Sequence, residues 1–274
     1  MKRKYEKASK KEIAESSWYM RFTPELVEFL KVCVTHAIEQ LALEQNKVLS
    51  EKLAKFKDVL IQDSTIIRLH KSLAKKWPAA RSKTVAAGVK VGMLVSAVAN
   101  SPKSIGIYAE TLNELKTLRM GPWIKDRILL IDLGFYKHQL FAKIKENGGY
   151  FVSRLKESAD PLIIEVYNTC SGNSIDVKGK YLSEILPKLK RQVLDVEVEI
   201  TFKRPNYNGK SKTIMDTERF RLVAVYNIDE ENYHVYLTNI SNEDLTPEDV
   251  AKLYGARWDI EMVQSQMPLL DTKW

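Results

Sequence analysis

Two short apolar runs, each ending in an aspartate, constrain this chain most. They are VLIQ followed by Asp63 and ILLI followed by Asp132, and both have the composition of buried strands. A carboxylate at such a position is costly to bury unless it is paired, hydrogen-bonded or bound to a metal ion. Either aspartate alone is more often a turn or cap residue. Two of them, on strands that we expect to be neighbours in one sheet, predict a site for Mg²⁺ or Mn²⁺.

The pattern around these runs predicts a fold that mixes helices and strands. Residues 59–69 are interpreted as a hairpin or two successive strands, and residues 111–120 as a helix. The run VLDVEVEITFKR alternates apolar and charged residues, which is typical of a strand exposed on one face. We therefore expect four segments: an N-terminal helical region at 1–50, a first part of the core at 51–155, a β-rich insertion at 156–235, and a last core strand with a final helix at 236–274.

The charge balance favours a nucleic-acid partner, although charge alone is weak support. Lys and Arg number 43 against 35 Asp and Glu, for a net charge of +8. Lys203, Arg204, Lys210 and Lys212 flank the turn at Asn208-Gly209. A hairpin tip that follows phosphates and an ordinary solvated turn explain them equally well.

Cysteine, histidine and hydropathy patterns narrow the class of protein further. The two cysteines lie far apart, which favours a reducing cytoplasm. The four histidines show no spacing typical of a zinc site. We expect no membrane span, because no apolar run approaches the ~20 residues that one needs.

The final helix carries the third group of chemically capable residues. Thr246 is expected to cap it, with Pro247 next and Asp249 at the capping-box position. Tyr254, Arg257 and Glu261 follow at spacings of three and four, so they share one helix face. Such a face could reach a phosphate and a metal ion together. On spacing alone, a surface Arg–Glu pair beside a partly buried tyrosine is the better interpretation.

The stretch LYGARWDIE resembles the signature helix of the insertion-sequence-four family of bacterial and archaeal DDE transposases. That signature is Tyr, two residues, Arg, three residues, Glu, six residues, Lys, and Tyr254, Arg257 and Glu261 match it. IQDSTIIRL and LLIDLGFYK resemble the regions around the family's two catalytic aspartates. The similarity covers roughly residues 12–264.

The resemblance implies a ribonuclease-H-like mixed sheet flanked by helices, with a β-rich insertion before the last catalytic helix. It implies that Asp63, Asp132 and Glu261 are catalytic and bind two ions of Mg²⁺ or Mn²⁺, and that Tyr254 and Arg257 contact the DNA backbone. The implied function is DNA transposition, through metal-dependent cleavage and strand transfer at insertion-sequence ends. The implied partners are double-stranded transposon ends, target DNA and a second copy of the chain in a synaptic complex at the nucleoid.

The sequence departs from the family pattern at its C-terminal end. Pro268 stands where the family lysine is expected, and proline would end the helix early. The chain stops thirteen residues past Glu261, so we expect a truncated or frame-shifted copy. One alternative is therefore a catalytically dead DNA-binding remnant or an inhibitor of full-length relatives. Another is a ribonuclease-H-like nuclease without strand transfer.

Overall fold

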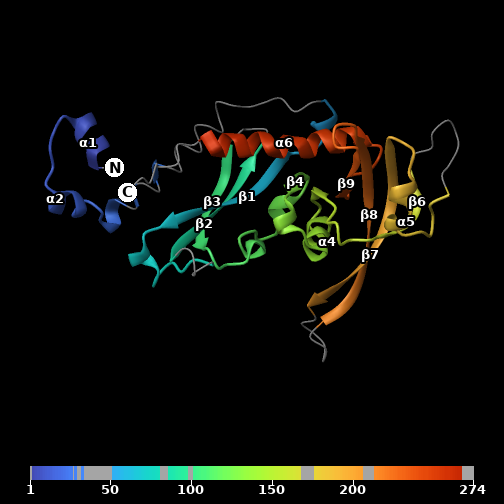
Figure 1. Cartoon of the computed structure of the whole chain (residues 1–274), viewed down its shortest axis with the longest axis horizontal. Coiled ribbons are helices and arrows are strands. Elements are labelled where there is room, and N and C mark those ends of the chain that lie inside the picture. The colour runs from blue at the N-terminus through green and yellow to red at the C-terminus, as the bar shows by residue number, and fades with distance from the viewer. Residues whose placement is uncertain are drawn as a thin grey trace.

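A mixed β-sheet with helices on both faces organises the chain (Figure 1). The computed structural model describes residues 2–26, 28–29, 32–33, 51–80, 86–97, 101–167, 176–205 and 213–266. The strands within those ranges are β1 (Asp58–Leu69), β2 (Ala87–Ser96), β3 (Ser101–Ala109), β4 (Arg127–Ile131), β5 (Tyr150–Arg154), β6 (Leu162–Val166), β7 (Val193–Pro205), β8 (Thr213–Asn227) and β9 (Asn232–Thr238). The α-helices are α1 (Lys2–Ser9), α2 (Glu15–Tyr19), α4 (His138–Glu146), α5 (Leu182–Ile185) and α6 (Pro247–Gln266). Three short 3-10 turns also matter here: η3 (Glu114–Lys116), η5 (Leu133–Phe135) and η6 (Leu186–Lys188).

The strand order confirms the predicted ribonuclease-H-like sheet. The described strands run in the order β3-β2-β1-β4-β5-β9-β8-β7-β6. β1, β2 and β3 pair antiparallel, whereas β1–β4 and β4–β5 pair parallel. β9 joins β5 antiparallel, and β8, β7 and β6 extend the sheet outward. The β-rich strands before the final helix thus continue the core sheet.

The prediction of a hairpin or two strands at 59–69 was wrong, because β1 is one unbroken strand. Its pairing with β2 runs without a shift from Leu60 to Leu69. Its pairing with β4 ends at Gln62 opposite Ile131. The polar residues that resemble a turn therefore mark the point where β1 loses its β4 neighbour and becomes exposed.

The predicted helix at 111–120 is also wrong, since only the single turn η3 forms there. The Thr117 hydroxyl donates to the Glu114 carbonyl at 2.6 Å. A side chain that bonds to a nearby backbone carbonyl competes with the helical hydrogen-bond pattern. The Glu114 side chain is in turn drawn towards the sheet by Ser64.

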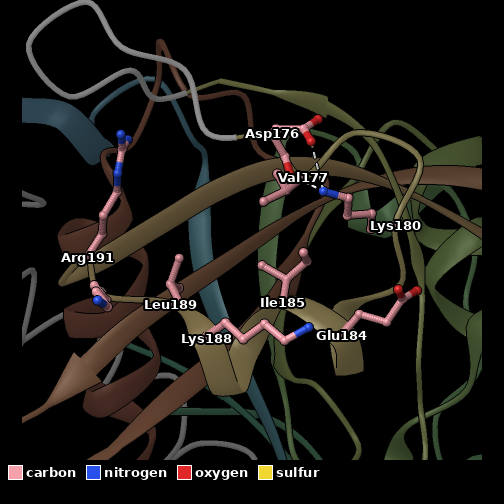
Figure 2. Close-up of a pocket in the computed structure, with 9 residues that line it drawn as sticks. Asp176, Val177, Lys180, Glu184, Ile185, Lys188, Leu189 and Arg191 are labelled. Atoms are coloured by element: carbon pink, nitrogen blue, oxygen red, sulfur yellow. Dashed lines mark hydrogen bonds and ion pairs between the residues drawn. The ribbon is translucent and has the colours of Figure 1, made fainter.

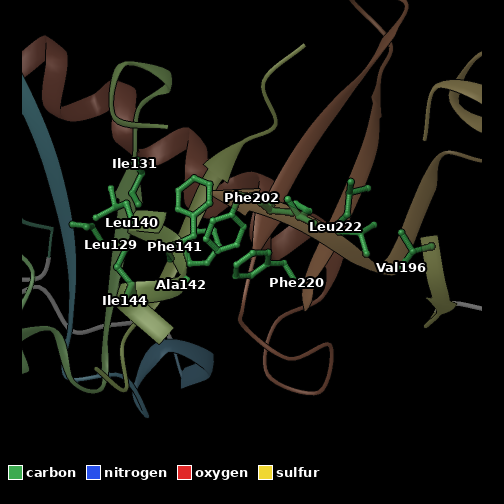
Figure 3. Packing of buried hydrophobic residues seen from close by; sticks show 14 of the residues in the cluster. Leu129, Ile131, Leu140, Phe141, Ala142, Ile144, Val196, Phe202, Phe220 and Leu222 are labelled. Carbon is green, nitrogen blue, oxygen red and sulfur yellow. The ribbon is translucent and has the colours of Figure 1, made fainter. Parts of the chain in front are cut away.

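Two hydrophobic clusters fill the two faces of the sheet, which explains the uninterrupted apolar run of β4. Leu129 and Ile131 pack on the α4 face, in the same cluster as Phe141 (Figure 3). Phe141 stacks on Phe151 there, with the ring centroids 4.4 Å apart. Ile128 and Leu130 pack on the other face, in the cluster that contains Val250 and Tyr254 of α6. A strand covered on both faces needs apolar residues at every position.

The N-terminal helices α1 and α2 lie away from the sheet (Figure 1). Much of the helical region predicted for residues 1–50 falls on 34–50, outside the described residues. Within the described part of the chain, no helix has both the length and the apolar character needed to cross a bilayer.

Candidate active site

The paired ends of β1 and β4 bring Asp63 and Asp132 to one edge of the sheet. Gln62 lies opposite Ile131 in the parallel ladder, so the aspartate that follows each of them occupies the next position along. Adjacent strands are about 4.8 Å apart. Alternation along β1 places Asp63 on the face of Ile61, which belongs to the α6 cluster. The expectation that the two strands are neighbours is confirmed.

Asp132 is oriented by the turn that it begins. Its Oδ2 accepts a hydrogen bond from the Gly134 backbone N–H at 3.1 Å, which caps η5. Its Oδ1 lies 3.6 Å from Nη2 of Arg257 on α6. That separation is long for a hydrogen bond, so the contact is mainly Coulombic. The Asp132 side chain remains 40% exposed and is therefore accessible to an ion or a substrate.

α6 is fixed at its start by the predicted capping box. The Thr246 N–H donates to Asp249 Oδ2 at 3.0 Å, and the Asp249 N–H donates to Thr246 Oγ1 at 3.3 Å. Lys52 donates to the same carboxylate at 2.5 Å. The direction in which α6 leaves this box determines which of its residues reach the end of β4.

Tyr254 and Arg257 are the α6 residues that reach it, and both are buried. The Tyr254 hydroxyl donates to the Ile131 carbonyl at 3.4 Å, next to Asp132. Burial raises the pKa of Tyr254, so the phenol stays protonated. The Arg257 guanidinium lies over the Tyr254 ring at 5.6 Å, and the Arg257 side chain is only 4% exposed. The Tyr254 ring also packs against Tyr236 of β9 at 5.4 Å. The predicted contact of Tyr254 and Arg257 with DNA stays a prediction.

Glu261 lies in α6, four residues after Arg257. Helix geometry puts position 261 on the same face, about 6 Å farther along the axis. Its side chain, with those of 258–266, lies outside the described residues. The meeting of three carboxylates therefore stays a prediction.

Glu114 is a neighbour of the site that the sequence did not reveal. Its Oε1 accepts from the Ser64 hydroxyl at 3.2 Å and lies 3.7 Å from Nζ of the buried Lys90. A methyl group added at Gly134 would lie 2.5 Å from Glu114 Oε2 and 3.4 Å from Asp132 Oδ2. Both carboxylates therefore face Gly134, and a side chain at this position would require the end of the Glu114 side chain to move. No local spacing distinguishes Glu114, because its partners lie far away along the chain.

The chemistry of the donor set fits a hard divalent cation. Asp63 is half-buried and Asp132 is partly exposed, and both offer carboxylate oxygens, which Mg²⁺ and Mn²⁺ prefer. The Arg257 contact shows that this edge already accommodates a positive charge beside Asp132. Among the side chains that the structure describes, no group of three or more His, Cys, Asp or Glu is arranged to hold an ion.

The basic hairpin tip is only partly described. Arg204 on β7 forms ion pairs with Glu146, at 2.5 Å, and with Asp216. Arg204 therefore links the hairpin of β7 and β8 to α4. Lys203 is exposed, and the turn that holds Lys210 and Lys212 lies outside the described residues.

Comparison with known proteins gives consistent matches. A model of the transposase DDE domain family matches residues 54–267. The chain is 25% identical to the transposase for insertion sequence element IS1151 of Clostridium perfringens, over 95% of this chain and 60% of that protein. It is 24% identical to the transposase for insertion sequence element IS231F of Bacillus thuringiensis subsp. israelensis, over 89% of this chain and 56% of that protein. The chain thus spans about three fifths of the length of these curated relatives.

Proposed function

We propose a function from one premise, that this chain belongs to the transposase DDE domain family. Membership implies dependence on divalent metal ions and binding to DNA. Our proposal is DNA transposition: the protein cuts DNA at insertion-sequence ends and transfers the freed strand to target DNA. The observation that carries it is the position of Asp63 and Asp132, which follow the paired ends of β1 and β4 beside α6.

In this proposal Asp63, Asp132 and Glu261 hold two ions of Mg²⁺ or Mn²⁺. When bound, the ions would stabilise the attacking and leaving oxygens of an in-line displacement at a phosphodiester. The donor set supports this assignment, because carboxylates are the ligands that such ions take.

The remaining residues position the site. The Gly134 N–H and Arg257 orient Asp132, and the Tyr254 hydroxyl holds the end of β4 in place. We propose that Arg257, already charged beside Asp132, also faces a phosphate of the bound DNA, with Tyr254 supporting its guanidinium.

Two displacements would complete the reaction. Water attacks a phosphodiester at the transposon end, and the bond to the leaving 3′-oxygen breaks. The 3′-hydroxyl so freed then attacks a target phosphodiester, forms a new bond and releases the target's own 3′-oxygen. A homodimer would hold two ends together in a synaptic complex at the nucleoid.

The first prediction concerns cleavage of cognate insertion-sequence ends in Mg²⁺ or Mn²⁺. Asp63→Asn, Asp132→Asn and Glu261→Gln should each slow nicking on the order of 10³-fold, since metal ligands contribute several kcal/mol at tenfold per 1.36 kcal/mol. The matched control is Asp126→Asn, at the other end of β4 and 41% exposed, close to the 40% of Asp132. Gel assays of labelled DNA should show unchanged nicking in this control.

Three other results would each change the assignment. A folded, unmodified chain that never nicks cognate ends with either ion would overturn catalysis. If it still binds those ends, the DNA-binding remnant or inhibitor is the better description. Nicking without joined products in a plasmid assay would indicate a nuclease that lacks strand transfer.

A further inference from the structure

A basic hollow of about 630 Å³ opens beside the turn that carries Asp132. Its walls come from two segments, residues 116–120, which begin at the last residue of η3, and residues 137–143, which begin just before α4 and continue into it. They contribute four exposed cations and no acidic residue. The cations are Lys116, Arg119, Lys137 and Lys143.

Both walls of the hollow lie close in sequence to residues of the candidate active site. Lys137 follows Asp132 by five residues, across η5. Lys116 follows Glu114 by two residues, and the Glu114 carboxylate faces the same Gly134 as Asp132 does. Both walls therefore begin at the edge of the sheet where the carboxylates lie.

The four cations have no anionic partner within the described part of the chain, where none of them takes part in an ion pair. Like charges gathered around one hollow repel each other unless an anion offsets them. Four cations on two separate walls exceed what one small anion needs. A chain of phosphates matches them better, because each cation then faces its own negative charge.

A second hollow, of about 470 Å³, is also basic, but acidic residues offset part of its charge (Figure 2). It lies by α5 and η6, next to β6, the fifth strand from β4 in the sheet. Four cations line it, Lys188 and Lys190 among them, but so do two acids, and one of these, Asp176, pairs with Lys180 at 2.9 Å. The contrast singles out the hollow beside Asp132.

We propose that this hollow binds the phosphate backbone of duplex DNA next to the bond that is cut. The inference rests on the proposed function, since it takes DNA as the substrate. The contacts would be independent of base sequence, because lysine and arginine read only the phosphate charge here. They would hold the duplex at the entrance to the carboxylate edge.

The test compares two double variants of the full chain that remove equal charge. Lys116→Gln/Lys137→Gln alters the hollow beside Asp132, and Lys188→Gln/Lys190→Gln alters the second hollow. Fluorescence anisotropy would measure the Kd for a non-cognate duplex at several salt concentrations, with chelator present so that no cleavage occurs. Thermal melting would confirm that both variants fold.

The hollow variant should reduce the slope of log K against log salt by about 1.8, because each lost phosphate contact removes about 0.9. Its Kd should rise more than tenfold at about 0.1 M salt. The control should change Kd less than about twofold. Equal effects of the two variants, no effect of the hollow variant, or no DNA binding by the unmodified chain would each overturn the proposal. If the unmodified chain binds DNA through the hollow but does not cleave cognate ends, only the proposed catalytic function would be overturned.

Discussion

Asp132 is the residue on which the candidate site depends most directly. A backbone N–H holds one of its oxygens, and a guanidinium from the final helix faces the other. Groups that orient a metal ligand typically change metal affinity or activity 10–100-fold when they are removed. Arg257 therefore deserves a test separate from that of the carboxylates.

The second prediction is that Arg257→Lys and Arg257→Met lower cleavage roughly 10–100-fold, and that the methionine variant is the less active of the two. Lysine keeps the charge but loses the planar group that stacks on Tyr254. The ion concentration for half-maximal nicking should rise, which a purely structural role would not produce. Lys252→Met, exposed on the same helix, is the control. Full activity in both Arg257 variants would contradict the positioning role.

The third prediction concerns Glu114, which compensates the charge of Lys90. The Lys90 side chain is only 7% exposed and also donates to the Leu112 carbonyl at 2.8 Å. Glu114→Gln should cost about 1–3 kcal/mol of unfolding free energy in urea, because a buried charge loses its partner. Adding Lys90→Met should recover part of that loss, whereas the exposed control Glu157→Gln should change little. A double variant less stable than Glu114→Gln alone would contradict this account.

At the scale of elements, the start of α6 determines where the final helix lies. Asp249 accepts hydrogen bonds from Thr246 and from Lys52, which ties the helix to the segment before β1. Burial by itself would raise the pKa of Asp249, but these hydrogen bonds outweigh burial and hold the pKa below its ordinary value. The unfolded chain therefore binds this proton more readily than the folded one.

The fourth prediction follows from the sign of that shift. The stability that Asp249 contributes is fully present above about pH 4, near the ordinary aspartate pKa. It is lost as the pH falls through the lowered pKa that Asp249 has in the folded chain. Asp249→Asn should cost about 0.5–2 kcal/mol at pH 7, in the range of helix caps. Urea unfolding should show the difference from the parent shrinking as pH falls below about 4. The neighbouring Glu248→Gln should lose only a few tenths of a kcal/mol, and an Asp249 difference that is constant with pH would contradict the argument.

At the scale of the whole molecule, the β-rich strands and the core share one sheet and one hydrophobic cluster. The Phe151 N–H donates to Asn239 Oδ1, and the Asn239 amide donates to the Gly149 carbonyl, both at 2.9 Å, where β5 meets β9. Leu129 of β4 and Phe220 of β8 belong to the same cluster. The boundary predicted at 156 is therefore not a break in the sheet.

Arg221 connects this extension to the start of α6. It forms two hydrogen bonds with the buried Asp195, at 2.7 and 2.6 Å, and donates to the carbonyls of Ser241 and Leu245. Removing one partner of a buried pair costs about 3–5 kcal/mol, because the other charge is left uncompensated.

The fifth prediction is that the sheet unfolds in one cooperative transition and that Arg221→Met lowers the midpoint of that whole transition. Calorimetry should give a calorimetric enthalpy equal to the van't Hoff value in both proteins. Arg219→Met is the matched control, since Arg219 is 62% exposed on the same strand and should shift stability by less than about 0.5 kcal/mol. Two separate transitions would show that the extension folds independently of the core.

Sequence patterns were sufficient to predict the structural features whose cause is local. The apolar runs before Asp63 and Asp132 identified β1 and β4, and Thr246 with Asp249 identified the start of α6. Strand alternation and capping depend on residues within a few positions of one another, so the sequence displays them directly. The ribonuclease-H-like sheet was predicted through the resemblance of LYGARWDIE and the two aspartate segments to a known family, not from local patterns.

Only the tertiary structure decided the features that depend on distant partners. β1 continues through its polar residues because β2 pairs with it from Leu60 to Leu69, and the Glu114 side chain takes its position from Ser64, 50 residues away in the chain. The contact of Arg257 with Asp132 joins residues that lie far apart in the chain. Such contacts form only after strand pairing and helix packing fix where each backbone lies, so local preferences in the sequence do not encode them separately.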